Sequence, residues 1–310
     1  MTGLSSPVDP LGLAQVPFPV MAPFRMQPGL CRIDDPLAGA LRPSSDQALA
    51  HSQKAVAVAI QQGRLPLLSG ESSGLAGQSG SREVDDLAHA LSLIKQALAP
   101  SADQNNQSQA DDPAGRNPLL IAAQTLRSQM QDDFVLMTAV TDKDSPPDLR
   151  ASLMAVAMPS GWRPADKLGQ GFLQLHQPVA DAALIRRAAP SLCAMMRAPG
   201  GLRRHVWTLC GAGQLSRHPD DEIAESVRTI ENLWFRCERQ TSYAMLDGAV
   251  VVFLIRIYTA PLVPLLAVAP DRAATLCAAL ESMSDAVLSY KSLEKIRPIV
   301  LRALGDRTTG

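Results

Sequence analysis

The chain has few aromatic residues and almost no net charge. Phenylalanine, tryptophan and tyrosine together make up 4% of its 310 residues, and 29 basic residues nearly balance 30 acidic ones. Proteins that grip nucleic acid usually offer a basic surface and aromatic side chains that stack on bases. The composition therefore predicts no nucleic-acid partner, and it gives no electrostatic reason to bind an anionic membrane.

Cysteines are also few, and their spacing matches neither a metal finger nor a disulfide framework. The five cysteines are scattered, odd in number and without a CxxC pair. Secreted disulfide frameworks normally use an even, regularly spaced set. The first 20 residues lack the basic segment and apolar run that are typical of a signal peptide. We therefore expect a cytoplasmic protein with reduced thiols.

One long hydrophobic run, residues 249–269, has the composition of a membrane span. Arg256 lies inside it, and Pro261 and Pro264 follow. A central arginine costs about 3 kcal/mol on membrane-insertion scales. The β-branched part, residues 250–259, instead predicts a central β-strand in which Arg256 is paired or faces a cofactor. We expect no membrane partner.

Nucleotide-binding and hydrolase motifs are absent or weak. GQG at 169–171 and GAG at 211–213 are too short for a dinucleotide fingerprint, and no GxxxxGK[ST] motif occurs. GESSG at 70–74 has the form GxSxG, but no clear helix follows it, as a nucleophile elbow requires. We interpret GESSG as a chance match.

What the chain does have is enough hydrophobic residues, 46%, for a substantial core. The periodicity predicts helices at 45–62, 83–98, 119–137, 165–175, 181–196, 271–283 and 285–293, and strands at 151–158, 204–210, 233–241 and 250–259. Asp247-Gly248 between the last two strands is a hairpin signal. The sequence predicts an α+β fold, an antiparallel sheet of four or five strands with helices packed on one face or end.

The composition also suggests three regions. Residues 1–117 read as an N-terminal extension with two helices and a flexible region rich in Gly, Ser and Gln. Residues 118–302 carry the denser pattern of strands and helices and form the predicted main domain. Residues 303–310 form a tail.

The stretch PSGWRPADKLGQGFLQLHQPV, residues 159–179, follows an apolar segment and predicts a tight turn and a short helix that ends near His176. An imidazole can ligate haem iron or another metal, or move a proton near neutral pH. No second histidine lies four residues away, and no C-x-x-C-H motif occurs. Axial ligation of a non-covalent haem therefore fits His176 better than a bare metal does, and packing in the core is the alternative.

A second dense stretch covers residues 233–258. Arg236, Glu238 and Gln240 alternate on one face of the predicted strand, and Cys237 and Arg239 share the other face. Such a pattern belongs either to a solvated sheet face or to a polar pocket. A guanidinium pairs well with a haem propionate, and a carboxylate pairs well with a cationic substrate.

Several blocks, taken in order, resemble the haem-dependent oxidative N-demethylase family. They are DDFVLM (132–137), PSGWRPADKLGQGFLQLHQPV (159–179), RHVWTL (204–209), RCERQTSYAMLDGAVVVFLIRIYTAPL (236–262), SYKSL (289–293) and, more weakly, PFRMQPGL (23–30). Val206 stands where the family usually has asparagine, and SYAML (242–246) replaces a Leu-Arg-Leu-Pro-like run. The resemblance implies removal of a methyl group from a small secondary amine such as dimethylamine. Because these departures fall where a substrate pocket is expected, they favour a different nitrogen-containing substrate.

The resemblance implies a PAS-like domain over residues 118–302 that holds haem b. It implies oxidation of a small amine or guanidine, such as arginine, at or next to nitrogen, by N-dealkylation or N-hydroxylation. O2 or peroxide is the expected co-substrate, with a separate reductase as a partner. A haem-binding PAS-like sensor or a haem carrier without catalysis is the alternative.

The resemblance also assigns roles to residues. His176 closes the block in which the family has its axial ligand, so it is the predicted iron ligand. The other predicted cofactor contacts are Lys167, Arg204, Arg239, Gln240 and Arg256. The predicted catalytic residues are Glu238, Arg236 and His205, with Asp132 and Asp133 as further candidate partners for a cationic substrate.

Overall fold

A computed structural model describes residues 12–26, 29–69, 82–99, 117–140, 147–176, 182–222 and 227–305. The GESSG motif lies outside the described residues, as do most of the predicted Gly/Ser-rich and Gln/Asn-rich segments and residues 306–310 of the predicted tail.

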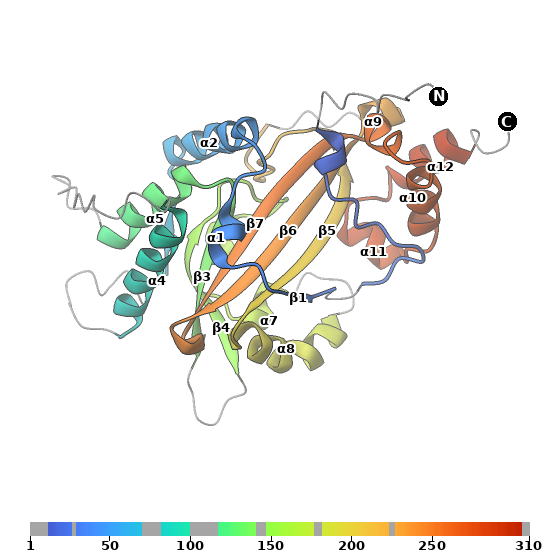
Figure 1. Cartoon of the computed structure of the whole chain (residues 1–310). Coiled ribbons are helices and arrows are strands. Elements are labelled where there is room, and N and C mark those ends of the chain that lie inside the picture. Colours follow the sequence, from blue (N-terminus) through green and yellow to red (C-terminus); the bar gives the residue numbers. More distant parts are fainter. Residues whose placement is uncertain are drawn as a thin grey trace, which may run out of the picture.

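A single antiparallel sheet runs through the described part of the chain, in the strand order β1-β5-β6-β7-β3-β4-β2 (Figure 1). The strands are β1 Cys31–Ile33, β2 Leu67–Leu68, β3 Asp133–Val140, β4 Asp148–Ala155, β5 Gly201–Cys210, β6 Trp234–Met245 and β7 Val250–Pro261. The predicted α+β architecture with packed helices is confirmed. The sheet has seven strands, more than predicted, because it gains β3 and two short edge strands.

Helices cover the sheet in separate groups (Figure 1). Their bounds are α1 Leu37–Leu41, α2 Asp46–Gln61, α4 Arg82–Leu98, α5 Pro118–Gln129, α6 Pro164–Lys167, α7 Phe172–Leu175, α8 Ala182–Arg197, α9 Leu262–Leu266, α10 Arg272–Glu281, α11 Asp285–Tyr290 and α12 Arg297–Gly305. Helices α1, α2, α4 and α5 bury one cluster against β3, β4 and β7. Helices α9 to α12 bury a second against β5 and β6, and α7 and α8 bury a third against β3 and β4.

Strand β3 occupies a segment that the periodicity predicted as helix. The predicted helix 119–137 ends instead at Gln129, and β3 begins at Asp133. The Asp133 carboxylate accepts hydrogen bonds from the amides of Ala157 (2.9 Å) and Met158 (2.8 Å). Pairing of Phe134 with β7 then extends the chain as a strand. Long-range pairing therefore overrides the local helix propensity of this segment.

The predicted helix 165–175 is also broken in two, because Gly169 adopts a positive φ of 76° between α6 and α7. A right-handed helix cannot pass through that backbone conformation. The break turns α7 back toward β4, where Gly171 forms an isolated bridge with Arg150. This turn sets the position of His176.

The predicted hairpin at Asp247-Gly248 is confirmed. Strands β6 and β7 pair in antiparallel register from Met245 opposite Val250. Asp247 and Gly248 have positive φ angles of 53° and 80°. A Cβ atom at Gly248 would lie 2.5 Å from the carbonyl oxygen of Arg197.

Gly248→Ala is expected to destabilise the protein by about 1–3 kcal/mol, because it adds a close backbone contact to a strained φ. Gly161→Ala is the matched control, since Gly161 has a φ of 84° but no atom within 4 Å of the added Cβ. Urea unfolding of both variants measures the difference. Equal losses would show that the contact with Arg197 carries no energy.

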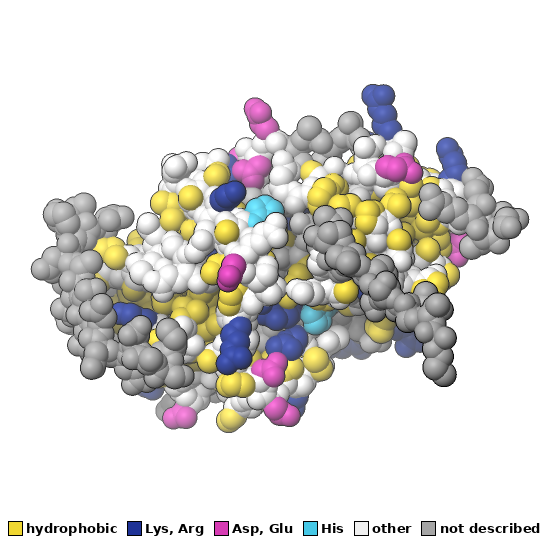
Figure 2. Space-filling model, turned by 45° about the horizontal axis from the view of Figure 1, so that its top comes forward, with side chains coloured by type: hydrophobic (Ala, Val, Ile, Leu, Met, Phe, Trp, Pro, Cys, Tyr) yellow, Lys and Arg dark blue, Asp and Glu magenta, His cyan; other side chains and the backbone are white. Residues whose placement is uncertain are grey.

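The hydrophobic run 249–269 forms β7 and α9, so the prediction of a central strand is confirmed. None of the helices described is long and apolar enough to cross a bilayer. On the face shown in Figure 2, acidic and basic side chains are interspersed. The division of the chain at residue 117 stays a prediction; β1 and β2, which precede it, pair with β5 and β4 in the same sheet.

Candidate functional site

His176 caps the C-terminus of α7 and is half-buried. Its Nδ1 lies 2.7 Å from the carbonyl oxygen of Phe172, and its ring packs on the Phe172 ring at a centroid distance of 4.3 Å. A carbonyl oxygen only accepts hydrogen bonds, so Nδ1 carries the proton of the neutral ring. Nε2 therefore keeps its lone pair, which is the arrangement that orients a histidine for an iron or metal ion.

Local contacts fix this turn. The Asp148 carboxylate accepts a hydrogen bond from the amide of Phe172 at 3.0 Å, and the Gln174 side chain accepts one from the amide of Gly171 at 3.1 Å. The Lys167 ammonium donates to the carbonyl of Leu175 at 3.2 Å. Helix α7 is therefore held at both ends, and His176 is held with it.

The surroundings of His176 favour its neutral form. Burial lowers the pKa of the imidazole, and the positive charges of Arg204 and Lys167 lower it further, while the hydrogen bond to Phe172 acts in the opposite direction. A neutral imidazole is the form that binds iron. The same two cations are side chains that pair well with carboxylates such as haem propionates.

A chain of polar side chains crosses one face of β5 and β6. Arg236 donates to the hydroxyl of Ser160 at 2.8 Å, and that hydroxyl donates to Glu238. Gln240 donates to the second oxygen of Glu238 at 2.7 Å and accepts from Arg204 at 2.6 Å. The alternating residues Arg236, Glu238 and Gln240 therefore form one hydrogen-bonded polar surface on a single face of β6.

This polar surface is partly open although β6 lies inside the sheet. Arg236 is buried and is held by the carbonyl oxygens of Met158 (3.1 Å) and Gln214 (3.3 Å). Glu238 and Gln240 are only half-buried, as is Arg204 beside them. Polar side chains that stay half-exposed on an interior strand are candidates for contact with a ligand on that face of the sheet. We call Arg204, Glu238 and Gln240 the open strip.

Three predicted site residues lie on the opposite face of the sheet. His205, Arg239 and Arg256 are opposite one another in the register of β5, β6 and β7. Successive side chains of a strand point to opposite faces, so His205 points away from the face that carries Arg204. The structure therefore does not bring these three residues to the open strip.

Arg239 and Arg256 instead hold α1 against the sheet. They donate to the carbonyl oxygen of Ala40 at 2.9 Å and 3.1 Å. Arg256 also donates from Nε to Asp132 at 3.0 Å. The sequence left open whether Arg256 is paired or faces a cofactor, and in the structure it is paired with Asp132.

The acidic pair that preceded the apolar run is likewise engaged. Asp132 pairs with Arg256, and Asp133 pairs with Arg127 at 2.7 Å, all of them buried. Burial raises the pKa of Asp133, against the opposing charge and hydrogen bonds of Arg127 and two backbone amides. Among the predicted carboxylates, Glu238 is the one that lies in the open strip.

Sequence reasoning gave no role to two residues beside the strip. Ser160 links Arg236 to Glu238 by hydrogen bonds. The Lys291 ammonium donates to the carbonyl of Trp207. It also lies 5.4 Å from the ring centroid of Phe24 and 5.2 Å from that of Trp207. Ser160 and Lys291 both belong to blocks that carried the family resemblance, PSGW and SYKSL. Their position in those blocks was the available signal.

Burial lowers the pKa of Lys291 to about 8, with the charge of Glu238 acting in the opposite direction. Between about pH 8 and the unfolded value of 10.5, the unfolded chain binds more protons than the folded one. Below about pH 8 the buried Lys291 ammonium is charged and destabilises the folded state. As the pH rises, the folded protein loses this proton and the destabilisation decreases. We expect the stability of the wild type, relative to Lys291→Met, to rise by about 1–2 kcal/mol between pH 7.5 and 10.

Urea unfolding of both proteins across that pH range measures this difference. Other groups titrate equally in the two proteins and cancel. A difference that does not vary with pH would show that Lys291 keeps an ordinary pKa.

No group of three or more His, Cys, Asp or Glu side chains within the described ranges could hold a metal ion. His176, whose Nε2 lone pair is available, lies near Lys167 and near Arg204 of the open strip. The fold and these side chains together define an α+β protein in which His176 is a candidate ligand for iron.

Comparison with known families places the chain more narrowly. Residues 101–301 match the family "Haem-dependent oxidative N-demethylase, alpha subunit-like", and the chain belongs to this family. That description names haem-dependent oxidative chemistry, which is oxidoreductase chemistry. No curated protein matches the chain.

Proposed function

We propose that the protein binds haem b through His176 and oxidises a small nitrogen-containing substrate at or next to its nitrogen. The observation that carries the proposal is the hydrogen bond from His176 Nδ1 to the carbonyl of Phe172, which leaves Nε2 free to ligate. Membership in a haem-dependent family supports the same reading.

The residues around His176 fit haem. His176 would ligate the haem iron through Nε2, whose lone pair is left available by the hydrogen bond of Nδ1 to Phe172. Arg204 and Lys167 would pair with the propionates. Bound haem would supply the activation of O2 or peroxide, with electrons from a separate reductase where O2 is used.

Glu238 is the group that we assign to the substrate. Its oxygens each accept one hydrogen bond, from Ser160 and from Gln240, and each keeps a second lone pair. A protonated amine or a guanidinium needs such a carboxylate when it leaves water. Ser160 and Gln240 would fix the orientation of the carboxylate, and buried Arg236 would hold Ser160 in place.

N-dealkylation and N-hydroxylation both suit a nitrogen held at Glu238. In the first, the carbon attached to that nitrogen is oxidised and an aldehyde leaves. In the second, the nitrogen itself gains the oxygen. Analysis of products from a panel of amines and guanidines separates the two, since only the first releases an aldehyde.

Titration of the purified protein with haemin tests the cofactor. We expect a Soret band with one-to-one stoichiometry, followed by consumption of O2 or peroxide that depends on an added amine or guanidine. A protein that takes up no haemin contradicts the proposal. Haem binding without any substrate-dependent turnover would favour a sensor or a carrier.

A further inference from the structure

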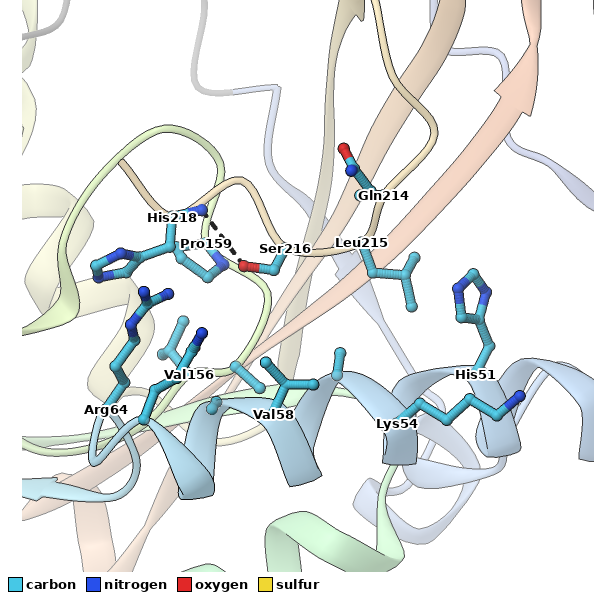
Figure 3. A pocket seen from close by; sticks show the side chains of 14 residues that line it. His51, Lys54, Val58, Arg64, Val156, Pro159, Gln214, Leu215, Ser216 and His218 are labelled. Atoms are coloured by element: carbon cyan, nitrogen blue, oxygen red, sulfur yellow. Dashed lines mark hydrogen bonds between the residues drawn. The ribbon is translucent and has the colours of Figure 1, made fainter. Parts of the chain in front are cut away.

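A cavity lies between α2 and the loops that follow β4 and β5, and His176 is not among the residues that line it (Figure 3). Its volume is about 280 Å³. The floor is apolar and includes Ala55, Val58, Val156 and Leu215. Val58 is 49% exposed, which is unusual for a valine on a helix that packs against the core. An apolar floor of this kind suits the hydrocarbon part of a small molecule.

Arg64 and His218 supply nitrogen donors at one end of the cavity (Figure 3). The Nη1 atom of Arg64 donates to Asp221 at 2.6 Å, and within the described ranges its other guanidinium nitrogens have no hydrogen-bond partner. His218 Nδ1 accepts a hydrogen bond from the amide of Asp220 at 3.2 Å, so the neutral ring carries its proton on Nε2. Burial lowers the pKa of His218, which favours that neutral form. Arg64 and His218 lie near each other at this end (Figure 3).

Asp221, the carboxylate that pairs with Arg64, is not among the residues that line the cavity. Besides Arg64 and His218 the lining includes Lys54 and His51, and no aspartate or glutamate is among its residues. Lys54 and His51 lie at the other end of the cavity (Figure 3). A ligand that is itself an acceptor and carries negative charge complements this lining, because guanidinium groups bind carboxylates with charge-assisted hydrogen bonds.

We infer that this cavity is a binding site for a small monocarboxylate with an apolar body. The carboxylate would accept hydrogen bonds from Arg64 and His218, and the hydrocarbon would lie over Val58 and Leu215. This inference does not depend on haem or on the proposed activity. It assigns a second ligand to the protein, apart from any substrate at Glu238.

The cavity shares its walls with the polar chain of the first site. Pro159 lines it and precedes Ser160, and Gln214 lines it while its carbonyl accepts from Arg236. The two wall segments are joined by hydrogen bonds between Arg217 and residues Pro159 and Gly161, each 2.9 Å long. A carboxylate in the cavity would therefore contact the same two loops that hold Arg236.

Hexanoate is the probe for this site, and hexanamide is its uncharged match. Ligand-observed NMR and calorimetry on the full-length protein measure both. We expect hexanoate to bind at least about tenfold more tightly than hexanamide, as charge-assisted hydrogen bonds require. Equal binding of the two probes, or no binding of hexanoate, would overturn the inference.

Two pairs of variants locate the site. Ala55→Phe fills the cavity, whereas Ala57→Phe adds the same ring on an exposed position of α2 outside the lining. Arg64→Gln removes the donor, whereas Arg163→Gln removes a neighbouring arginine that pairs with Asp220 but does not line the cavity. We expect hexanoate affinity to fall about tenfold or more in the first member of each pair and to stay unchanged in the second.

Loss of hexanoate binding in Ala57→Phe or Arg163→Gln as well would overturn the assignment to this cavity. Unchanged binding in both Ala55→Phe and Arg64→Gln would do the same. Circular dichroism and thermal unfolding check that each variant is folded. The Arg64→Gln variant also loses its pairing with Asp221, so Ala55→Phe, which leaves that pair in place, keeps the test decisive.

Discussion

Replacing His176 with alanine is expected to abolish the Soret band that haemin gives with the wild type, or to weaken haem affinity by more than about 100-fold. Removal of a hydrogen-bond partner behind a metal ligand already costs 10- to 100-fold in affinity, and His176→Ala removes the ligand itself. Its half-buried position makes a folding defect small. Absorbance titration with haemin measures the change.

His205→Ala is the matched control for this experiment. It removes a histidine whose pKa is also lowered by burial, but from the opposite face of the sheet. Haem binding should persist in that variant. Added imidazole should restore part of the Soret band in His176→Ala, because the small ligand can occupy the space of the deleted ring. Retention of the band in His176→Ala, or its equal loss in both variants, would refute the ligand assignment.

Replacing Glu238 with glutamine should lower kcat/KM for a cationic substrate by about 10- to 100-fold, since hydrogen bonds to charged groups contribute about 1.5–3 kcal/mol. The glutamine side chain has nearly the same shape and can still accept from Ser160 or Gln240 through one oxygen. The substrate, however, loses its opposite charge. The effect should lie mainly in KM, and the haem spectrum should not change.

Two further variants interpret that result. Glu238→Asp restores the charge and should recover part of the affinity for substrate. Glu294→Gln removes an exposed carboxylate from the loop after α11 and should leave the kinetics unchanged. A Glu238→Gln enzyme with wild-type kinetics would exclude Glu238 as the substrate's partner.

The two faces of β6 could be predicted from the sequence. The charged residues of this strand recur at every second position, so one strand was enough to place Arg236, Glu238 and Gln240 on one face and Arg239 on the other. The alternation alone does not show which residues of neighbouring strands share a face, because that depends on how the strands are paired. Only the pairing of β5 with β6 shows that His205 lies beside Arg239, on the face away from Glu238.

The N-terminal half of the fold was harder to predict. β3 has helix-forming residues beside it and becomes a strand because β7 and β4 pair with it on both sides. A short strand was expected within residues 23–34, where β1 lies, but β2 has too few residues for a periodicity; both pair at the edges that β5 and β4 offer. Their formation is a property of the assembled sheet.

The sequence by itself determined the class of fold, the hairpin at Asp247-Gly248, the strand within the long hydrophobic run and the family. The hairpin and the strand depend on residue type and spacing over a short stretch, whereas the fold class and the family depend on the order of such stretches along the chain. The tertiary structure alone decided that Asp132 and Arg256 neutralise each other, that His176 donates through Nδ1, and that Glu238 stays half-exposed. These outcomes depend on which groups meet across the sheet, and burial, charge pairing and hydrogen-bond direction are settled only when distant segments are in contact.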